Sequence, residues 1–289
     1  MIIDLHCHTN CSDNSYSIED VLKLAAQNNI SKLAITDHDT TIGLERAIAL
    51  GKDLSIDIIP GIEISAYDYK RNRRTHILGL FVASGHPALE ALCRPMREER
   101  HNASRLMTRK LIQAGYHISW EQVLRLAENG TGVYKQHIMH ALILNGYTDS
   151  IYGPLYKKLF FRGDRQTLPG LAFVPVHYLD AIDAIHAIRK AGGVPVLAHP
   201  GQFDNFSAVP EFVEAGLGGI EVFHPLHDAA DEKKAMQLAE TYHLAQTGGS
   251  DFHGYYTDTG SVPGSRSIDR DRFALLEEKR DQTGKSIQS

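Results

Sequence analysis

The stretch Ile2-Ile3-Asp4-Leu5-His6-Cys7-His8 joins a short apolar run directly to two histidines separated by one residue. An apolar run of this length is typical of a buried strand. Side chains two residues apart in an extended chain point to the same side, so His6 and His8 can face one cavity while Cys7 faces away. The stretch therefore predicts a strand that ends at a polar site.

The same arrangement recurs along both ends of the chain. Ser17 and Asp20 form a capping-box pattern, which predicts a helix start, and apolar spacing of helical type follows it. We expect strands at residues 2–5, 33–36, 57–59, 62–65, 75–82, 194–198, 219–223 and 246–249, with a break at Pro60-Gly61. Helices are expected at residues 41–50, 181–191, 208–215 and 229–242, the first of them ended by Gly51. Strands that alternate with helices predict an α/β fold with a mostly parallel sheet or barrel.

The middle of the chain has a different pattern. Residues 97–114, 120–129 and 136–145 have helical spacing without a clear buried strand between them, and residues 155–174 are expected to be a loop that crosses a face. We therefore expect a barrel formed by residues 1–84 and 179–270, a helical insertion domain at residues 85–178, and a polar C-terminal tail at residues 271–289 with a loose end.

Composition limits the classes of function. The net charge of −5 and the lack of a basic tract disfavour tight binding of duplex DNA through phosphate neutralisation. Three cysteines, Cys7, Cys11 and Cys93, are too few for a disulfide framework and fit a reducing compartment. No apolar run reaches membrane-spanning length, and the N-terminus lacks the pattern of a signal peptide, so we expect a cytoplasmic protein without membrane contact.

The candidate functional residues lie at or just beyond the predicted strand ends. They are His6, His8, His38, Glu63, His76, His199, Asp251 and His253, and with Asp13 they number nine. The carboxyl ends of barrel strands meet on one face, so these segments are expected to converge. Imidazoles mixed with carboxylates suit Zn, Mn or Fe. Nine ligands are too many for one ion and suit two or three, with a carboxylate that bridges.

Each residue alone has a structural alternative. A single His-x-His is a weak metal signal, and Asp37 and Asp39 can serve as turn residues. The joint pattern is harder to explain structurally, because clustered histidines and carboxylates cost desolvation free energy unless they are paired or bind metal. We therefore predict a metal site.

Taken together, the residues at these strand ends resemble the PHP (polymerase and histidinol phosphatase) superfamily. The resemblance lies in Asp4-Leu5-His6-Cys7-His8-Thr9, Thr36-Asp37-His38-Asp39, Pro60-Gly61-Ile62-Glu63-Ile64-Ser65, Ala198-His199-Pro200 and Gly249-Ser250-Asp251-Phe252-His253-Gly254. It implies a distorted (β/α)7 barrel with a metal centre at the strand ends. An acid at Asp13 and a helical insertion resemble the branch of small stand-alone phosphoesterases.

The resemblance also implies how the nine residues divide between two or three divalent ions, with Mn foremost and Zn or Fe as alternatives. His6, His8, Glu63 and Asp251 would hold the first ion. Glu63 would bridge to a second, completed by His76 and His199, and Asp13, His38 and His253 would hold the third.

One segment departs from the family's pattern. Relatives that act on nucleoside 3′,5′-bisphosphates or as 5′–3′ exoribonucleases often carry Arg-Pro-His in the insertion, where this chain has Lys135-Gln136-His137. Lys135 can supply the positive charge, but as a point charge rather than a bidentate fork. Lys135, His137 and Arg100 are the candidates to bind a second phosphate or the ribose. Ser17 is a further candidate phosphate contact, although capping explains it more simply.

The expected function is hydrolysis of phosphate esters of small ribose phosphates, by attack of a metal-activated hydroxide on phosphorus. Phosphoribosyl 1,2-cyclic phosphate and nucleoside 3′,5′-bisphosphates are the expected substrates, and His199 or His227 would protonate the leaving oxygen. The alternative is a 5′–3′ exoribonuclease that acts on short single-stranded RNA. A nuclease predicts a long basic groove, whereas a small-molecule enzyme predicts a closed pocket lined by the insertion. A third class, a PHP module that binds metal without catalysis, predicts missing ligands, and all nine positions are filled.

Overall fold

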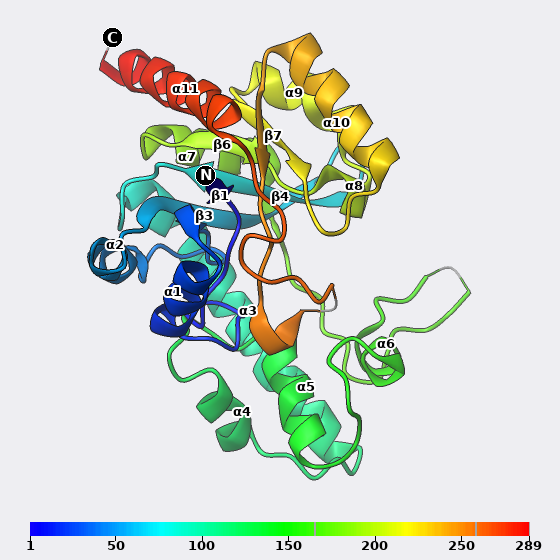
Figure 1. The fold of residues 1–289 in the computed structure, drawn as a ribbon. Helices are drawn as coiled ribbons and strands as arrows, with labels where there is room; N and C mark the ends of the chain where they lie inside the picture. The colour runs from blue at the N-terminus through cyan, green and yellow to red at the C-terminus, as the bar shows by residue number, and fades with distance from the viewer. Residues whose placement is uncertain (165, 258, 289) are drawn as a thin grey trace.

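A single sheet with helices packed against it forms the body of the molecule (Figure 1). The structure is a computed structural model that describes residues 1–164, 166–257 and 259–288. Seven strands follow one another in the order β1, β2, β3, β4, β6, β7, β8, and β5 pairs with β3. The strands are β1 (Ile2–Asp4), β2 (Ile30–Ile35), β3 (Asp57–Asp68), β4 (Arg73–Leu80), β5 (Leu179–Asp180), β6 (Val194–Leu197), β7 (Gly219–Phe223) and β8 (Ala245–Gly248). The predicted α/β class is confirmed.

β4 runs antiparallel to both of its neighbours in the sheet path, β3 and β6, whereas the other consecutive pairs along that path are parallel. Its first half therefore lies at the edge where the parallel strands end. His76 is in that half, and its carbonyl accepts the N–H of Ala198, just after β6, at 3.1 Å. The reversed direction explains how a residue near the start of a strand joins residues near the ends of others.

β3 is one continuous strand, so the predicted break at Pro60-Gly61 is wrong. Pro60 pairs with Ile35 of β2 and needs no N–H at that position. A Cβ at Gly61 would lie 2.8 Å from Thr36 Cγ2 and 2.9 Å from the Ile35 carbonyl. The glycine therefore lets two strands approach closely and does not mark a turn.

The two ends of the sheet path meet just beyond β1 and β8. The N–H of Leu5 donates to the Gly248 carbonyl at 3.0 Å, and Cys7 and Phe252 form a parallel bridge. These links give the sheet a barrel-like closure. They also bring the segment that carries His6 and His8 beside the segment that carries Asp251 and His253.

Helices from both halves of the chain cover the sheet. They are α1 (Ile18–Gln27), α2 (Leu44–Asp53), α7 (Ala181–Lys190), α8 (Pro200–Phe203), η1 (Phe206–Ala208), α9 (Val209–Glu214) and α10 (Ala229–Tyr242). Ser17 Oγ accepts the Asp20 N–H at 3.2 Å, which confirms the predicted helix cap. Gly51 lies inside α2, so the predicted helix end at Gly51 is wrong. A Cβ there would be 2.5 Å from the Ile58 side chain, so the glycine permits close packing of α2 on β3. No helix among the described residues combines the length and apolar character needed to cross a bilayer.

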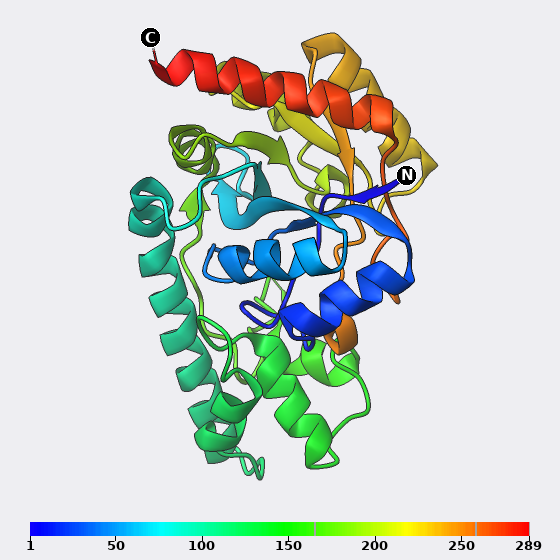
Figure 2. The same ribbon diagram turned by 60° about the vertical axis from the view of Figure 1, so that its left-hand side comes forward.

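The middle of the chain forms a helical group with its own apolar core. Its helices are α3 (Pro87–Gln113), α4 (Trp120–Leu126), α5 (Lys135–Leu144) and α6 (Pro154–Phe160). α3 begins at Pro87, earlier than expected, and runs from the sheet into the helical group (Figure 2). Its early residues Leu89 and Cys93 pack into the core of the sheet, and its later ones into the helical core. α6 lies in the segment expected to be a loop, so that expectation is partly wrong.

The segment predicted to be a C-terminal tail contains a helix that packs on the sheet. The chain after the short turn η2 (Gly254–Tyr256) continues into α11 (Arg270–Gln288), which lies across the end of the sheet away from the helical group (Figures 1 and 2). Phe273 and Leu276 are buried in a cluster with Ile3, Leu78 and Val196 from three strands. The charged residues between them hid this apolar face in the sequence.

We expect Phe273→Ala to lower the free energy of unfolding by about 3–5 kcal/mol, because a large buried side chain would leave a cavity. Leu275→Ala is the matched control, since Leu275 is exposed on the same helix and should change stability by no more than about 0.5 kcal/mol. Urea denaturation of both variants measures the difference. Equal stabilities would show that α11 does not seal the sheet.

Candidate metal centre

Glu63 lies at the centre of the polar site and is 1% exposed. Its Oε1 is 2.8 Å from His76 Nδ1 and 2.9 Å from His199 Nε2. Its Oε2 is 3.2–3.3 Å from one nitrogen each of His6, His8 and His38. Burial disfavours the charged carboxylate, but the surrounding imidazoles outweigh it and hold the pKa of Glu63 well below its ordinary value.

The backbone fixes Glu63 in this position. Its N–H donates to the Asp37 carbonyl at 3.3 Å, and its carbonyl accepts the Asp39 N–H at 2.9 Å. These bonds extend the β2–β3 pairing past the end of β2 and place His38 beside Glu63. The Thr36-Asp37-His38-Asp39 stretch thus continues a strand edge up to the site.

Asp251 completes a group of four around one point. Its Oδ1 is 3.2 Å from His6 Nε2 and 3.1 Å from His8 Nε2, the same two nitrogens that approach Glu63 Oε2. Ligands about 2.1 Å from an ion at tetrahedral angles lie about 3.4 Å apart, close to these separations. The four residues expected to form the first site are therefore together.

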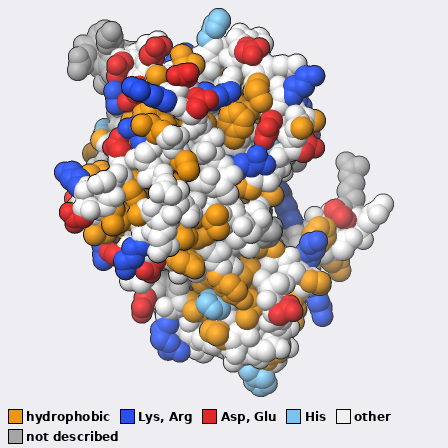
Figure 3. Space-filling model, in the orientation of Figure 1, with side chains coloured by type: hydrophobic (Ala, Val, Ile, Leu, Met, Phe, Trp, Pro, Cys, Tyr) orange, Lys and Arg blue, Asp and Glu red, His pale blue; other side chains and the backbone are white. Residues whose placement is uncertain are grey.

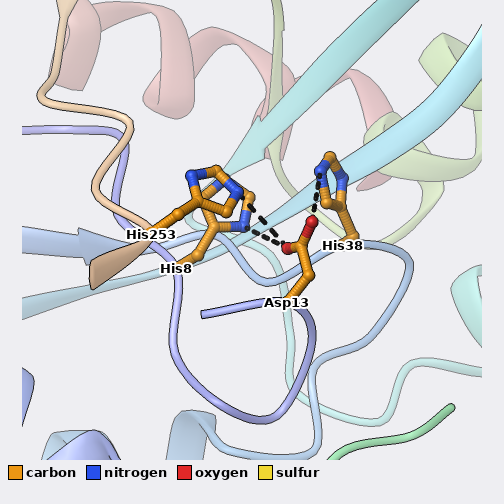
Figure 4. A group of neighbouring side chains, drawn as sticks. All are labelled: His8, Asp13, His38 and His253. Atoms are coloured by element: carbon orange, nitrogen blue, oxygen red, sulfur yellow. Dashed lines mark ion pairs between the residues drawn. The ribbon is translucent and has the colours of Figure 1, made fainter. Parts of the chain in front are cut away.

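A second group surrounds Asp13, and Figure 4 shows its side chains directed at one another. Asp13 Oδ1 is 3.3 Å from His253 Nε2 and 3.9 Å from His8 Nδ1, and Oδ2 is 4.0 Å from His38 Nε2. Burial opposes ionisation of Asp13, but His253 and His38 outweigh it and lower the pKa of the carboxyl. His8 lies between the two groups and belongs to both.

The atoms at these centres have the character of metal ligands. His6 Nε2, both ring nitrogens of His8, Asp13 Oδ1 and Asp251 Oδ1 are buried without a hydrogen-bond partner among the described residues. Buried polar atoms are nearly always satisfied in folded proteins, so such a set calls for an additional partner. Imidazole nitrogens and carboxylate oxygens fit divalent ions such as Mn, Zn or Fe.

Glu221, which the sequence analysis missed, holds two of these histidines. Its Oε1 accepts from His6 Nδ1 at 3.1 Å, which leaves the lone pair of His6 Nε2 directed at the cluster. Its Oε2 accepts the backbone N–H of His199 at 2.8 Å. His199 has a φ of +27°, a conformation that needs such support. Glu221 lies inside β7, and only its position in a strand beside a site could have indicated it.

His224, also missed, orients Asp251. Its Nδ1 accepts the Leu226 N–H at 3.1 Å, so its Nε2 carries the proton and donates to Asp251 Oδ2 at 3.2 Å. This leaves Asp251 Oδ1 for His6 and His8. Partners of this kind fix the geometry and basicity of metal ligands.

Asp37 and Asp39 organise the loops around the site, as their alternative assignment to turns predicted. Asp37 accepts from the Thr9 N–H at 2.8 Å and the Ser12 hydroxyl at 2.6 Å. Asp39 Oδ1 accepts the Ser65 N–H at 2.8 Å.

Three residues predicted to act on substrate do not face the site. His227 donates from Nδ1 to the Val222 carbonyl at 2.8 Å and accepts the Gly201 N–H at Nε2, so it has no free proton for a leaving group. His137 is buried and its Nδ1 accepts the Tyr134 N–H at 3.0 Å, which caps α5. Ser17 caps α1 at the surface. The structure thus gives each of the three residues a hydrogen-bonding role outside the cavity.

The groups around Glu63 and Asp13 together form what we call the metal-ligand cluster, or Glu63 cluster. A cavity of about 400 Å³ opens onto this cluster. The helical group supplies one wall through Arg100, Ser104, Met107, Tyr134, Lys135, Gln136, Tyr152 and Tyr156. Gln136 donates to Asp13 Oδ2 at 2.8 Å. The segment Lys135-Gln136-His137 thus divides its tasks: Lys135 faces the cavity, Gln136 holds Asp13, and His137 caps the helix.

Arg100 lines the cavity rather than a solvated helix face. Its Nη2 is 2.7 Å from Asp39 Oδ2 and donates to Ser65 Oγ at 2.9 Å. Its guanidinium also lies over the Tyr134 ring at 4.7 Å. Arg100 is therefore already paired with a buried carboxylate.

Comparison with known proteins places this site in context. The model of the PHP domain family matches residues 4–192. The chain is 46% identical to the phosphoribosyl 1,2-cyclic phosphate 1,2-diphosphodiesterase of Eggerthella lenta, over 91% of this chain and 97% of that protein. It is 32% identical to a 5′–3′ exoribonuclease of Salmonella typhimurium, over 88% and 85%. It is also 32% identical to a 3′,5′-nucleoside bisphosphate phosphatase of Chromobacterium violaceum, over 87% of each.

The fold is also similar to a solved structure described as an amidohydrolase from Chromobacterium violaceum with bound sulfate. The TM-score is 0.84, the identity is 28%, and the match covers 96% of this chain and 97% of that one. The helical group and the sheet are therefore shared together.

We expect removal of divalent ions with a chelator to lower the melting temperature, because binding to the folded state alone stabilises it by about 2.7 kcal/mol at a hundredfold excess over Kd. Calorimetry before and after readdition of Mn²⁺ measures the change. An unchanged melting temperature would contradict a metal centre.

Glu221→Gln should weaken metal binding by about 10–100-fold, since the outer partner of His6 would lose its charge. Metal content after dialysis, measured by mass spectrometry, checks this. Glu232→Gln is the control, because the Glu232 carboxylate pairs with Arg266 at 3.2 Å and not with a residue of the cluster. Equal metal content in all three proteins would remove the role given to Glu221.

Proposed function

The chain belongs to the PHP domain family and is a phosphoric ester hydrolase, and we propose that its substrate is phosphoribosyl 1,2-cyclic phosphate, with nucleoside 3′,5′-bisphosphates as the second small-molecule candidate. The observation that carries this proposal is the cavity that joins the Glu63 cluster at its base to cationic and aromatic side chains of the helical group. The 46% identity to the diphosphodiesterase supports the cyclic phosphate as the first choice.

We assign the metal ligands as the resemblance implied. His6, His8, Glu63 and Asp251 would hold one ion, Glu63 with His76 and His199 a second, and Asp13, His38 and His253 a third. The distances to Glu63 and Asp13 support this division, and the place of His8 in both groups supports closely spaced ions. Bound divalent ions would supply Lewis acidity that activates water and stabilises negative charge on phosphorus oxygens.

Two buried side chains, Glu221 and His224, hold the proposed metal ligands in position. Glu221 and His224 keep His6, His199 and Asp251 oriented, so the cluster needs little rearrangement during reaction. Hydrolysis of the cyclic diester adds one water and gives a monoester, and a second water releases phosphate.

His199 is the one of the two predicted proton donors that lines the cavity. Its Nδ1 has no hydrogen-bond partner among the described residues. We propose His199 as the group that faces the leaving oxygen, in addition to its place beside Glu63.

A 5′–3′ exoribonuclease is the alternative, favoured by the similarity to the Salmonella enzyme. An exoribonuclease predicts a long basic groove for the RNA strand. On the face drawn in Figure 3, basic and acidic side chains of the described residues are interspersed without a continuous basic band. The net charge of −5 agrees with this distribution.

Purified protein with Mn²⁺ should release phosphate fastest from phosphoribosyl 1,2-cyclic phosphate in a panel that also contains a nucleoside 3′,5′-bisphosphate and a short 5′-phosphorylated RNA. Phosphate release and nucleotide chromatography measure the three rates. Faster degradation of the RNA would favour the exoribonuclease, and no turnover of any compound would refute the assignment.

Loss of an outer partner of a metal ligand reduces activity by about 10–100-fold. His8→Ala should reduce turnover further, because His8 belongs to both groups of candidate ligands. Arg109→Gln, on the exposed face of α3, is the control and should retain the wild-type rate. Wild-type turnover by His8→Ala would overturn the site assignment.

A further inference from the structure

A second cavity, of about 270 Å³, adjoins the one above the metal-ligand cluster. The two share Arg74, Lys135, Val176 and Tyr178 as a common wall. Beyond this wall the second cavity is lined by Tyr67, Tyr69 and Arg162, together with residues of the segment before β5.

The β3–β4 ladder connects the two cavities with a fixed spacing. Ser65 pairs with His76, and two residues further from the cluster Tyr67 pairs with Arg74. Residues two apart on a strand share a face and are separated by about 7 Å. Ser65 and His76 line the first cavity, and Tyr67 and Arg74 line the second. A ligand that spans the two residue pairs would therefore extend about 7 Å from the cluster toward Tyr67 and Arg74.

Three cations line the second cavity, and two of them, Arg74 and Lys135, stand at the common wall. Arg74, Lys135 and Arg162 form no ion pair with a carboxylate among the described residues, unlike Arg100, which is paired with Asp39. Burial first, and then Arg74 and Arg100, lower the pKa of Lys135 to about 8. Neighbouring cations held without anions are costly unless an anionic ligand joins them.

Aromatic side chains hold these cations at the cavity. Arg74 lies over the Tyr178 ring at 5.1 Å, and Arg162 lies over the Tyr67 ring at 6.0 Å. Such stacking orients a guanidinium while its N–H groups stay available to a phosphate. Lys135, the first residue of α5, lines both cavities, and its ammonium lies over the Phe160 ring at 5.6 Å.

We propose that the second cavity binds the non-reacting phosphate of the substrate, with Arg74 and Lys135 at the shared wall and Arg162 at the outer side. The inference rests on the proposed function, because it concerns the second phosphate of the same substrate. It replaces the earlier expectation that Arg100 and His137 bind this group. The site would select phosphorylated sugars over sugars without a second phosphate.

The test compares kcat/KM for phosphoribosyl 1,2-cyclic phosphate with kcat/KM for ribosyl 1,2-cyclic phosphate, which lacks the 5-phosphate. Arg74→Gln should lower this ratio by about 10–100-fold, the usual effect of losing a charge-assisted contact to phosphate. Arg162→Gln should lower it by a smaller factor, and Arg109→Gln, a control on an exposed helix face, should leave it at the wild-type value. The loss should lie mainly in KM.

A ratio that Arg74→Gln leaves at the wild-type value would overturn the proposal. So would an equal loss for both substrates, because it would indicate general damage to the site. If the wild type turns over neither compound, the proposed function fails. In that case calorimetric titration of phosphoribosyl 1,2-cyclic phosphate decides the subsite: weaker binding by Arg74→Gln supports it, and wild-type binding contradicts it.

Discussion

A single buried carboxylate, that of Glu63, determines the construction of the site. Its two oxygens face imidazoles that come from four separate segments of the chain, and little of it reaches solvent. A buried charge is stable only where partners surround it. The fold provides these partners because the parallel strands end on the same side of the sheet. β4 runs in the opposite direction, so His76, near its start, lies on that side too.

The arrangement around Glu63 also depends on residues that do not contact it. His6 is useful only if Nε2 faces the cluster, and Glu221 ensures this by accepting from Nδ1. Asp251 is useful only if Oδ1 faces the cluster, and His224 ensures this by occupying Oδ2. The same organisation explains the cavity above. The ladder that carries Glu63 and His76 continues to Tyr67 and Arg74, so one hairpin connects the Glu63 cluster to the proposed phosphate-binding cavity.

The sequence predicted the elements that depend on local pattern. The alternation of strands and helices and the position of His or acid at strand ends were sufficient to bring nine candidate residues to one place. Roles that depend on hydrogen-bond partners could not be predicted in this way. His227 and His224 stand three residues apart in the same loop, and only their partners separate a structural histidine from one that orients Asp251. No motif distinguishes Arg74 from its neighbour Arg73, so the sequence analysis did not select it. α11 was predicted to be a polar tail because Phe273 and Leu276, which pack against the strands, are separated by charged and exposed residues.

We propose that the Glu63 cluster binds divalent ions and that hydrolysis depends on them. The most direct measurement is the number of Mn²⁺ ions bound per chain in the wild type and in Glu63→Gln, which keeps the size of the side chain and removes its charge. We expect two or three ions per chain in the wild type and the loss of at least one in the variant, together with loss of phosphate release. An unchanged number of bound ions in Glu63→Gln would contradict it.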